Sequence, residues 1–139
     1  MLTASEKEEI QESIRLAELK TSGEIRVHID NKCDSDPLEK AVSVFNKLKM
    51  YETHERNGVL IYISFSDRKL AIIGDEGINN AVPTDFWEST KNELIFRFKR
   101  NEFAQGIIDA VTEAGIQLKQ YFPVKSDDRN ELSNEITTE

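Results

Sequence analysis

The sequence predicts an α/β fold, a three-layer α/β/α sandwich around a small mixed sheet with a parallel β-α-β unit and an antiparallel hairpin strand. Three observations lead to this prediction. Segments with helical spacing of apolar residues alternate with short strand-like segments along the chain. The most apolar segment, residues 58–65 (GVLIYISF), is typical of a central strand buried on both faces. Only Ser66-Asp67-Arg68 separates it from the apolar run at 69–74, so these two strands are expected to be antiparallel neighbours.

The first two elements are predicted to be a helix and a strand. Thr3 and Glu6 have the spacing of a capping box, and the apolar residues after them form a narrow stripe, which predicts a helix over residues 1–20. Residues 24–30 then alternate between apolar and polar side chains. That alternation predicts a strand with one wetter face.

A second helix is predicted between this strand and the central one. Asp36 followed by Pro37 is a typical helix start, with the aspartate as N-cap and the proline in the first helical position. Apolar residues continue at helical spacing, and we expect the helix to end near Met50. The connection should therefore be a right-handed crossover between two parallel strands.

Two more helices and an acidic tail are predicted after the hairpin. Thr84 and Asp85 are typical of a helix start, and a further helix follows Asn101 and is stopped by Pro123. Residues 124–139 hold five acidic and two basic residues with almost no apolar content. This composition predicts a disordered tail. The expected organisation is one domain over residues 1–123 and an acidic disordered tail over 124–139.

Composition and charge argue against several classes of protein. The 139 residues include 26 acidic and 18 basic side chains, giving a net charge of −8, which argues against nucleic-acid binding. No apolar stretch approaches the roughly 20 residues of a membrane-spanning helix, and the N-terminus shows no secretory signal. Cys33 is the single cysteine, so an intramolecular disulfide cannot form. We therefore expect a cytoplasmic domain without a membrane anchor.

Acidic residues are predicted to gather at one edge of the sheet. Parallel strands begin at the same edge and the antiparallel strand ends there, which brings Glu24, Asn57, Asp75 and Glu76 to one place. Asp85 follows only a short loop later and can join them. Oxygen donors in a glycine-flanked loop with little basic charge suit Ca²⁺ or Mg²⁺. The sequence therefore predicts a divalent-cation site at Glu24, Asp75, Glu76 and Asp85.

Each of these residues also has a simpler interpretation. Asp85 can be only a helix N-cap, Asp75 and Glu76 can be ordinary turn residues, and Glu24 can be a solvated strand end. The opposite edge of the sheet collects a second polar group, namely Asp30, Asn31, Asp34, Asp36 and Asp67. Its sequence imitates the start of a calcium-binding loop, but Pro37 interrupts the pattern and no spaced glutamate completes it.

Four segments of the chain resemble one known family. They are SGEIRVHI, ERNGVLIYISFSDRKLAIIGDEGIN, VPTDFW and FKRNEFAQGIIDAV, and the resemblance spans residues 3–123. The family is the TPM domain family, named after a thylakoid lumen protein, a photosystem II repair protein and a nematode receptor modulator. The resemblance implies an α/β/α sandwich, divalent-cation binding and the phosphatase activity attributed to a plant member.

Several residues match positions of the family pattern. Gly74 and Gly77 match the glycines of the family's loop after the hairpin, and Thr84 and Asp85 match the start of the following helix. Glu24 matches the acidic residue that opens the first strand. Asp75 and Glu76 replace the usual aromatic-containing loop. Their negative charge would attract a cation and repel a phosphate.

The leading functional prediction is a stand-alone binding or regulatory module that holds Ca²⁺ or Mg²⁺ at the four carboxylates. Two alternatives remain open. One is a weak metal-dependent acid phosphatase that uses the same carboxylates. The other is a protein-interaction module that meets a protein partner through the tail at 124–139 or the region around Trp87.

Overall fold

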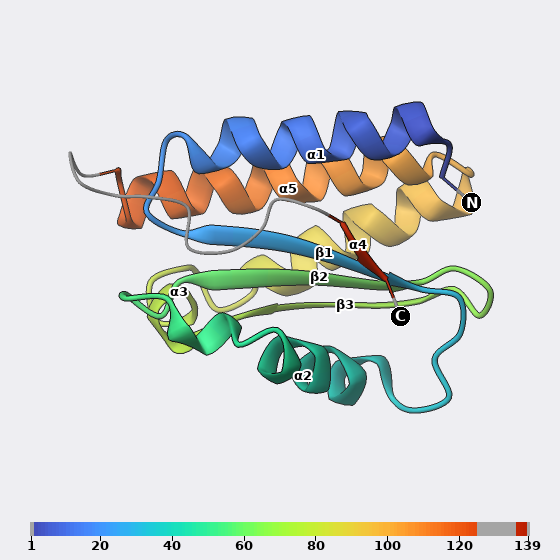
Figure 1. The fold of residues 1–139 in the computed structure, drawn as a ribbon, viewed down its shortest axis with the longest axis horizontal. Coiled ribbons are helices and arrows are strands. Elements are labelled where there is room, and N and C mark those ends of the chain that lie inside the picture. Colours follow the sequence, from blue (N-terminus) through green and yellow to red (C-terminus); the bar gives the residue numbers. More distant parts are fainter. Residues whose placement is uncertain (1, 125–135, 139) are drawn as a thin grey trace.

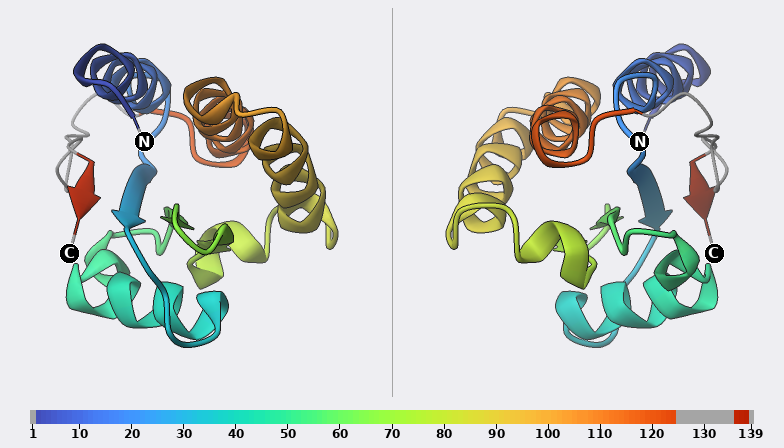
Figure 2. Two further views of the ribbon diagram at one scale, coloured as in Figure 1. Left: turned by 90° about the vertical axis from the view of Figure 1, so that its right-hand side faces the viewer. Right: turned by 90° about the vertical axis from the view of Figure 1, so that its left-hand side faces the viewer.

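The computed structural model describes residues 2–124 and 136–138 and shows a sheet between two layers of helices (Figures 1 and 2). Its strands are β1 (Glu24–Asp30), β2 (Gly58–Ser64), β3 (Lys69–Gly74) and β4 (Thr137–Thr138), in the order β3-β2-β1-β4. The first pair, β1 and β2, is parallel, and β2 and β3 are antiparallel. The predicted α/β/α class with a mixed sheet is confirmed.

The helices divide between the two faces of the sheet. They are α1 (Ala4–Glu18), α2 (Pro37–Lys47), α3 (Glu76–Asn79), α4 (Phe86–Lys99) and α5 (Phe103–Tyr121), with a short 3₁₀ helix, η1, at Met50–Glu52. The views in Figure 2 place α1, α4 and α5 on one face and α2 on the other. The predicted crossover from β1 through α2 to β2 is therefore present.

The central strand β2 shows why both helical layers are needed. Val59, Ile61 and Ile63 belong to the larger core that α1, α4 and α5 complete, whereas Leu60 and Tyr62 belong to the smaller core beneath α2. All five side chains are fully buried. A strand with two apolar faces can be removed from water only when helices cover both of them.

Local sequence signals determine the starts of α1 and α2. Thr3 forms the predicted capping box with Glu6: its Oγ1 accepts from the Glu6 N–H at 3.1 Å, and Glu6 Oε1 accepts from the Thr3 N–H at 2.9 Å. The Asp36 carboxylate accepts from the N–H groups of Leu38 and Glu39 at 3.0 and 3.2 Å. Both caps satisfy amide groups that have no partner inside the helix.

Two local features differ from the prediction. The second helix ends at Lys47 rather than near Met50, because Lys49 adopts a left-handed backbone conformation with φ of 56° and a 3₁₀ turn follows. The glycine-containing loop after β3 holds the short helix α3. Asp75 is the N-cap of that helix, since its side chain accepts from the Glu76 N–H.

The predicted disordered tail is described only in part. Residues 125–135 and 139 lie outside the described residues. Of the remaining tail residues, Thr137–Thr138 form β4 beside β1 and Ile136 packs against the larger core. None of the described helices combines the length and apolar content that crossing a membrane requires.

The contact of α3 with the loop before β2 generates a stability prediction. A Cβ at Gly77 would lie 2.1 Å from the Glu55 carbonyl oxygen and 2.6 Å from that of Arg56, and these backbone atoms have little room to move. We expect Gly77→Ala to lower the free energy of unfolding by about 3 kcal/mol, the upper part of the range for overpacked sites. Urea denaturation measures the change.

The matched control is Gly106→Ala, near the start of α5. Its Cβ would meet side-chain atoms, the nearest being Arg97 Cβ and Leu94 Cδ1 at 3.0 Å, and alanine is the better helix former by about 0.8–1.0 kcal/mol. We expect a much smaller effect from this variant. Equal unfolding midpoints for the two variants would contradict the predicted backbone clash at Gly77.

Candidate functional site

The structure places the four predicted cation ligands in different environments. Glu24 and Asp75 are buried, with 1% and 7% of their surfaces exposed, whereas Glu76 and Asp85 are exposed. Among residues 2–124 and 136–138, no group of three or more His, Cys, Asp and Glu side chains is arranged to hold a metal ion. The predicted set is therefore not assembled as one cluster in this structure.

Asp75 is bound by an arginine that the sequence analysis did not take into account. Arg56 donates from Nε to Asp75 Oδ2 at 2.7 Å and from Nη2 to Asp75 Oδ1 at 2.8 Å, and its Nη1 lies 3.4 Å from Glu76 Oε1. The hydrogen bond to Asp75 raises the pKa of the arginine. The expectation of little basic charge in this loop is wrong, because the sheet places the residue before Asn57 beside the end of β3.

Asp85 stands at the N-cap position of α4 without making a side-chain cap. Its backbone carbonyl accepts from the Ser89 N–H at 3.0 Å, but its carboxylate makes no capping hydrogen bond. Asp85 therefore occupies the N-cap position, as its simpler interpretation predicts, but its side chain does not cap the helix.

A buried carboxyl pair at the start of β1 was missed in the sequence. Glu18, at the end of α1, is 4% exposed, and its Oε2 accepts from the Ile25 N–H at 2.8 Å. Burial, a hydrogen bond with the Glu24 side chain and the charge of Glu24 together raise the pKa of Glu18 to about 9. At neutral pH the pair therefore holds one proton, and Glu18 donates a hydrogen bond to Glu24.

Two oxygen atoms at this site, one of them in the pair itself, have no hydrogen-bond partner among the described residues. They are Glu18 Oε1 and Asn57 Oδ1, both buried. The Asn57 backbone carbonyl accepts from the Glu24 N–H at 3.4 Å, and its side-chain amide donates to Ser22 Oγ at 3.2 Å. Such unpaired acceptors are uncommon in protein interiors and require a physical explanation.

One sequence signal could have revealed Glu18. Ile10 and Ile14 mark the buried stripe of α1, and Glu18 is the next residue in the same four-residue step. An acidic side chain on a buried stripe needs a partner inside the protein. The partner, Glu24, becomes apparent only when α1 is packed on the sheet.

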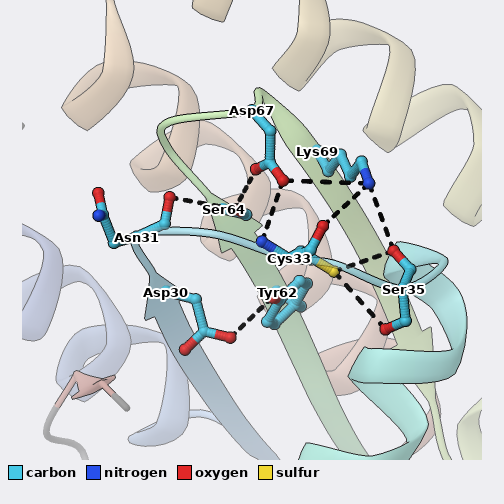
Figure 3. Close-up of polar contacts among 8 residues, drawn as sticks. All are labelled: Asp30, Asn31, Cys33, Ser35, Tyr62, Ser64, Asp67 and Lys69. Atoms are coloured by element: carbon cyan, nitrogen blue, oxygen red, sulfur yellow. Dashed lines mark hydrogen bonds and ion pairs between the residues drawn. The ribbon is translucent and has the colours of Figure 1, made fainter.

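A second polar group lies along the other half of β1. His28 Nε2 is 2.9 Å from Asp30 Oδ1. Figure 3 shows the other contact of this carboxylate, in which Tyr62 donates to Asp30 Oδ2 at 2.7 Å. The other nitrogen of the imidazole, Nδ1, is 2.7 Å from Thr137 Oγ1. Burial, followed by hydrogen bonds with Asp30 and Cys33, raises the pKa of Tyr62. Asp30 is thus a buried carboxylate with two side-chain partners.

The hairpin turn is tied to the loop after β1 through Asp67. Its Oδ2 accepts from the Cys33 N–H at 3.0 Å, and Ser64 donates to its Oδ1 (Figure 3). These hydrogen bonds, that from Ser64 first, lower the pKa of Asp67. Lys69 donates from Nζ to the Cys33 carbonyl at 2.9 Å. Asp67 and Lys69 therefore hold the loop and bury Cys33, which is 3% exposed.

The predicted polar edge is assembled in part. Asp30, Asn31 and Asp67 lie together there, since Ser64 also donates to the Asn31 carbonyl. Asp36 is the N-cap of α2, and Asp34 is exposed. The resulting arrangement stabilises a loop, and no calcium-loop geometry is formed by these residues.

With the fold and both polar groups described, comparison with known proteins identifies the family. The model of the TPM domain matches residues 1–117. The chain belongs to the TPM domain family. A search of curated proteins found no match.

Solved structures of TPM-fold proteins are similar to the chain. The NMR structure of the BA42 protein from the psychrophilic bacterium Bizionia argentinensis is 45% identical, with a TM-score of 0.92 over 100% of this chain and 96% of that one. The N-terminal domain of cg2496 from Corynebacterium glutamicum is 13% identical, with a TM-score of 0.69 over 94% and 82%. A P. gingivalis N-terminal domain is 17% identical, with a TM-score of 0.64 over 87% and 78%. The last two similarities show the fold alone.

The Asp30 network generates a prediction for Tyr62→Phe. The change removes one of the two side-chain donors to a buried carboxylate and should lower the free energy of unfolding by about 1–3 kcal/mol. Because the pKa of Tyr62 is raised, we also expect the near-ultraviolet phenolate signal between about pH 8 and pH 11 to be the same with and without this residue. Denaturation and spectroscopic titration measure the two effects.

Tyr121→Phe is the matched control for stability, because Tyr121 is 39% exposed and lies at the end of α5. Its effect should stay within about 0.5 kcal/mol. A smaller phenolate signal in Tyr62→Phe than in the wild type would contradict the proposed environment of Tyr62.

The buried pair generates a prediction for pH. The Glu18 carboxyl has an ordinary pKa of 4.5 and a folded-state pKa of about 9, so the folded state binds its proton more tightly. The stabilisation from this group is complete below about pH 4.5 and is lost as the pH rises towards 9. The free energy of unfolding should therefore fall between about pH 5 and pH 9, and Glu18→Gln should reduce that fall.

Glu12→Gln on the same helix is the control, since Glu12 is exposed and paired with Arg15. It should keep the wild-type pH dependence over this range. Urea denaturation at several pH values measures all three proteins. If Glu18→Gln and the wild type respond identically to pH, the shared proton is not the cause.

Proposed function

We propose that this protein binds a divalent cation, Ca²⁺ or Mg²⁺, at the buried pair of Glu18 and Glu24, with Asn57 Oδ1 as a third oxygen. The observation that carries the proposal is the meeting of two buried carboxyl groups that share a proton, at a place where Glu18 Oε1 and Asn57 Oδ1 have no hydrogen-bond partner among the described residues. Glu24 is the residue that this proposal shares with the sequence prediction.

The chemistry of the donors fits a hard cation. Carboxylate and amide oxygens are the protein ligands that Ca²⁺ and Mg²⁺ prefer, with waters completing the coordination. Two ionised carboxylates in a poorly hydrated site repel each other, and the proton of Glu18 relieves that repulsion in the absence of metal. A divalent cation would replace the proton and neutralise both charges.

The other predicted ligands support the proposal less. Asp75 is held at both oxygens by Arg56, so a cation would have to compete with a guanidinium. Glu76 and Asp85 are exposed, and an exposed carboxylate gains little from a cation that stays hydrated. The phosphatase alternative requires a positive group to receive phosphate, and Arg56 already engages Asp75 and Glu76.

Calorimetric titration of the full chain with CaCl₂ and with MgCl₂ tests this function. We expect Glu24→Gln to weaken binding at least tenfold, because it removes one of the two charges at the site. Asp85→Asn is the matched control and should bind as the wild type does. The opposite pattern, in which Asp85→Asn no longer binds the cation and Glu24→Gln binds it as the wild type does, would assign the cation to the loop and overturn the proposal.

The affinity should also depend on pH. Because the cation must displace the proton of Glu18, its affinity should rise as the pH increases towards about 9. Thermal unfolding with and without CaCl₂ at about pH 6 and about pH 8.5 measures this independently of calorimetry. A larger stabilisation at the lower pH would contradict displacement of the proton.

A further inference from the structure

The outer edge of β1 carries a short strand from the far end of the chain. Thr137 lies opposite His28 and Thr138 opposite Ile29, in parallel with β1. This strand, β4, lies at the edge of the sheet away from β3 (Figure 1). A sheet edge offers unpaired N–H and C=O groups to any extended segment, so β4 shows what this edge accepts.

The two consecutive residues Ile136 and Thr137 make different side-chain contacts at this edge. The Thr137 hydroxyl is 2.7 Å from His28 Nδ1 and 3.4 Å from the Val27 carbonyl oxygen. The preceding side chain, Ile136, packs against the larger core. The edge therefore receives an apolar side chain followed by a hydroxyl-bearing one.

The imidazole that contacts the hydroxyl is held in a fixed orientation. His28 is 4% exposed, its Nε2 is 2.9 Å from Asp30, and its ring stacks on Tyr62 with 5.9 Å between the ring centroids. Only its Nδ1 is directed to the edge strand. Held this way, His28 can select a hydroxyl by direct hydrogen bonding, because it cannot turn to accommodate another side chain.

We propose that the outer edge of β1 is a docking site for an extended segment of a partner protein, in which an apolar residue is followed by Thr or Ser and the backbone runs parallel to β1. Residues 136–138 are the chain's own occupant of that site. Addition of a strand to a sheet edge is a common mode of peptide recognition, with main-chain hydrogen bonds supplying affinity and side-chain contacts supplying specificity.

The extent of pairing supports exchange of the occupant. The described pairing between β1 and β4 involves two residue pairs, whereas β1 and β2 pair along seven. A partner segment that pairs along more of β1 than His28 and Ile29 gains additional main-chain hydrogen bonds, which allow it to displace β4.

Fluorescence anisotropy with a labelled peptide tests the proposal in the full chain. The probe is NEITTE, the sequence of residues 134–139. Thr137→Pro removes an N–H group and the hydroxyl from the resident strand without shortening the chain. We expect the peptide to bind this variant at least tenfold more tightly than it binds the wild type. The matched peptide NEIVTE, which lacks the hydroxyl opposite His28, should bind the variant at least tenfold more weakly than NEITTE.

Several outcomes would overturn the proposal. If Thr137→Pro binds NEITTE and NEIVTE equally, or if it binds neither peptide, the result contradicts the proposal. The third outcome is dimerisation of the wild-type chain that Ile136→Asp abolishes, which would make a second copy the occupant. Amide NMR spectra of α5 confirm that the variants are folded. If Thr137→Pro disturbs these spectra, Thr137→Val replaces it, and the same preference for NEITTE is required.

Discussion

The parallel pairing of β1 with β2 is the constraint on which the positions of the polar residues depend. It places Glu24 beside Gly58 and Asp30 beside Ser64, so that both strands begin at one edge of the sheet and end at the other. Since β2 is apolar on both faces, helices must cover it from both sides. Polar residues are then concentrated at the two ends of the strands and on the face of β1 that carries Arg26 and His28.

The two ends of the sheet stabilise buried acidic groups in different ways. At the start of β1, Glu18 keeps its proton and shares it with Glu24. At the other end, the Asp30 carboxylate accepts a hydrogen bond from the Tyr62 hydroxyl at one oxygen and contacts the His28 imidazole at the other. The first arrangement can exchange a proton for a cation, whereas the second orients a histidine towards the edge strand.

Local signals predicted the elements well, and they predicted the site less well. The capping box at Thr3, the N-cap at Asp36 and the short hairpin turn between β2 and β3 depend on neighbours in sequence, so their patterns are visible in the chain. Topology correctly placed Glu24 and Asp75 at the start of β1 and the end of β3. The pairing of Asp75 with Arg56 could not be predicted in the same way, because the side-chain direction of a loop arginine depends on packing.

The sequence alone determined the order of helices and strands and the central position of β2, because periodicity, caps and turn lengths are local properties. The resemblance to the TPM domain family also lay in segments of the sequence itself, and the family model confirms it over residues 1–117. Tertiary structure decided which carboxylates share a proton and which strand covers β1. Glu18 and Glu24 meet only after α1 packs on the sheet, and His28 meets Thr137 across 109 positions of the chain. Contacts of that kind depend on the register and packing of elements distant in sequence, and no local pattern encodes them.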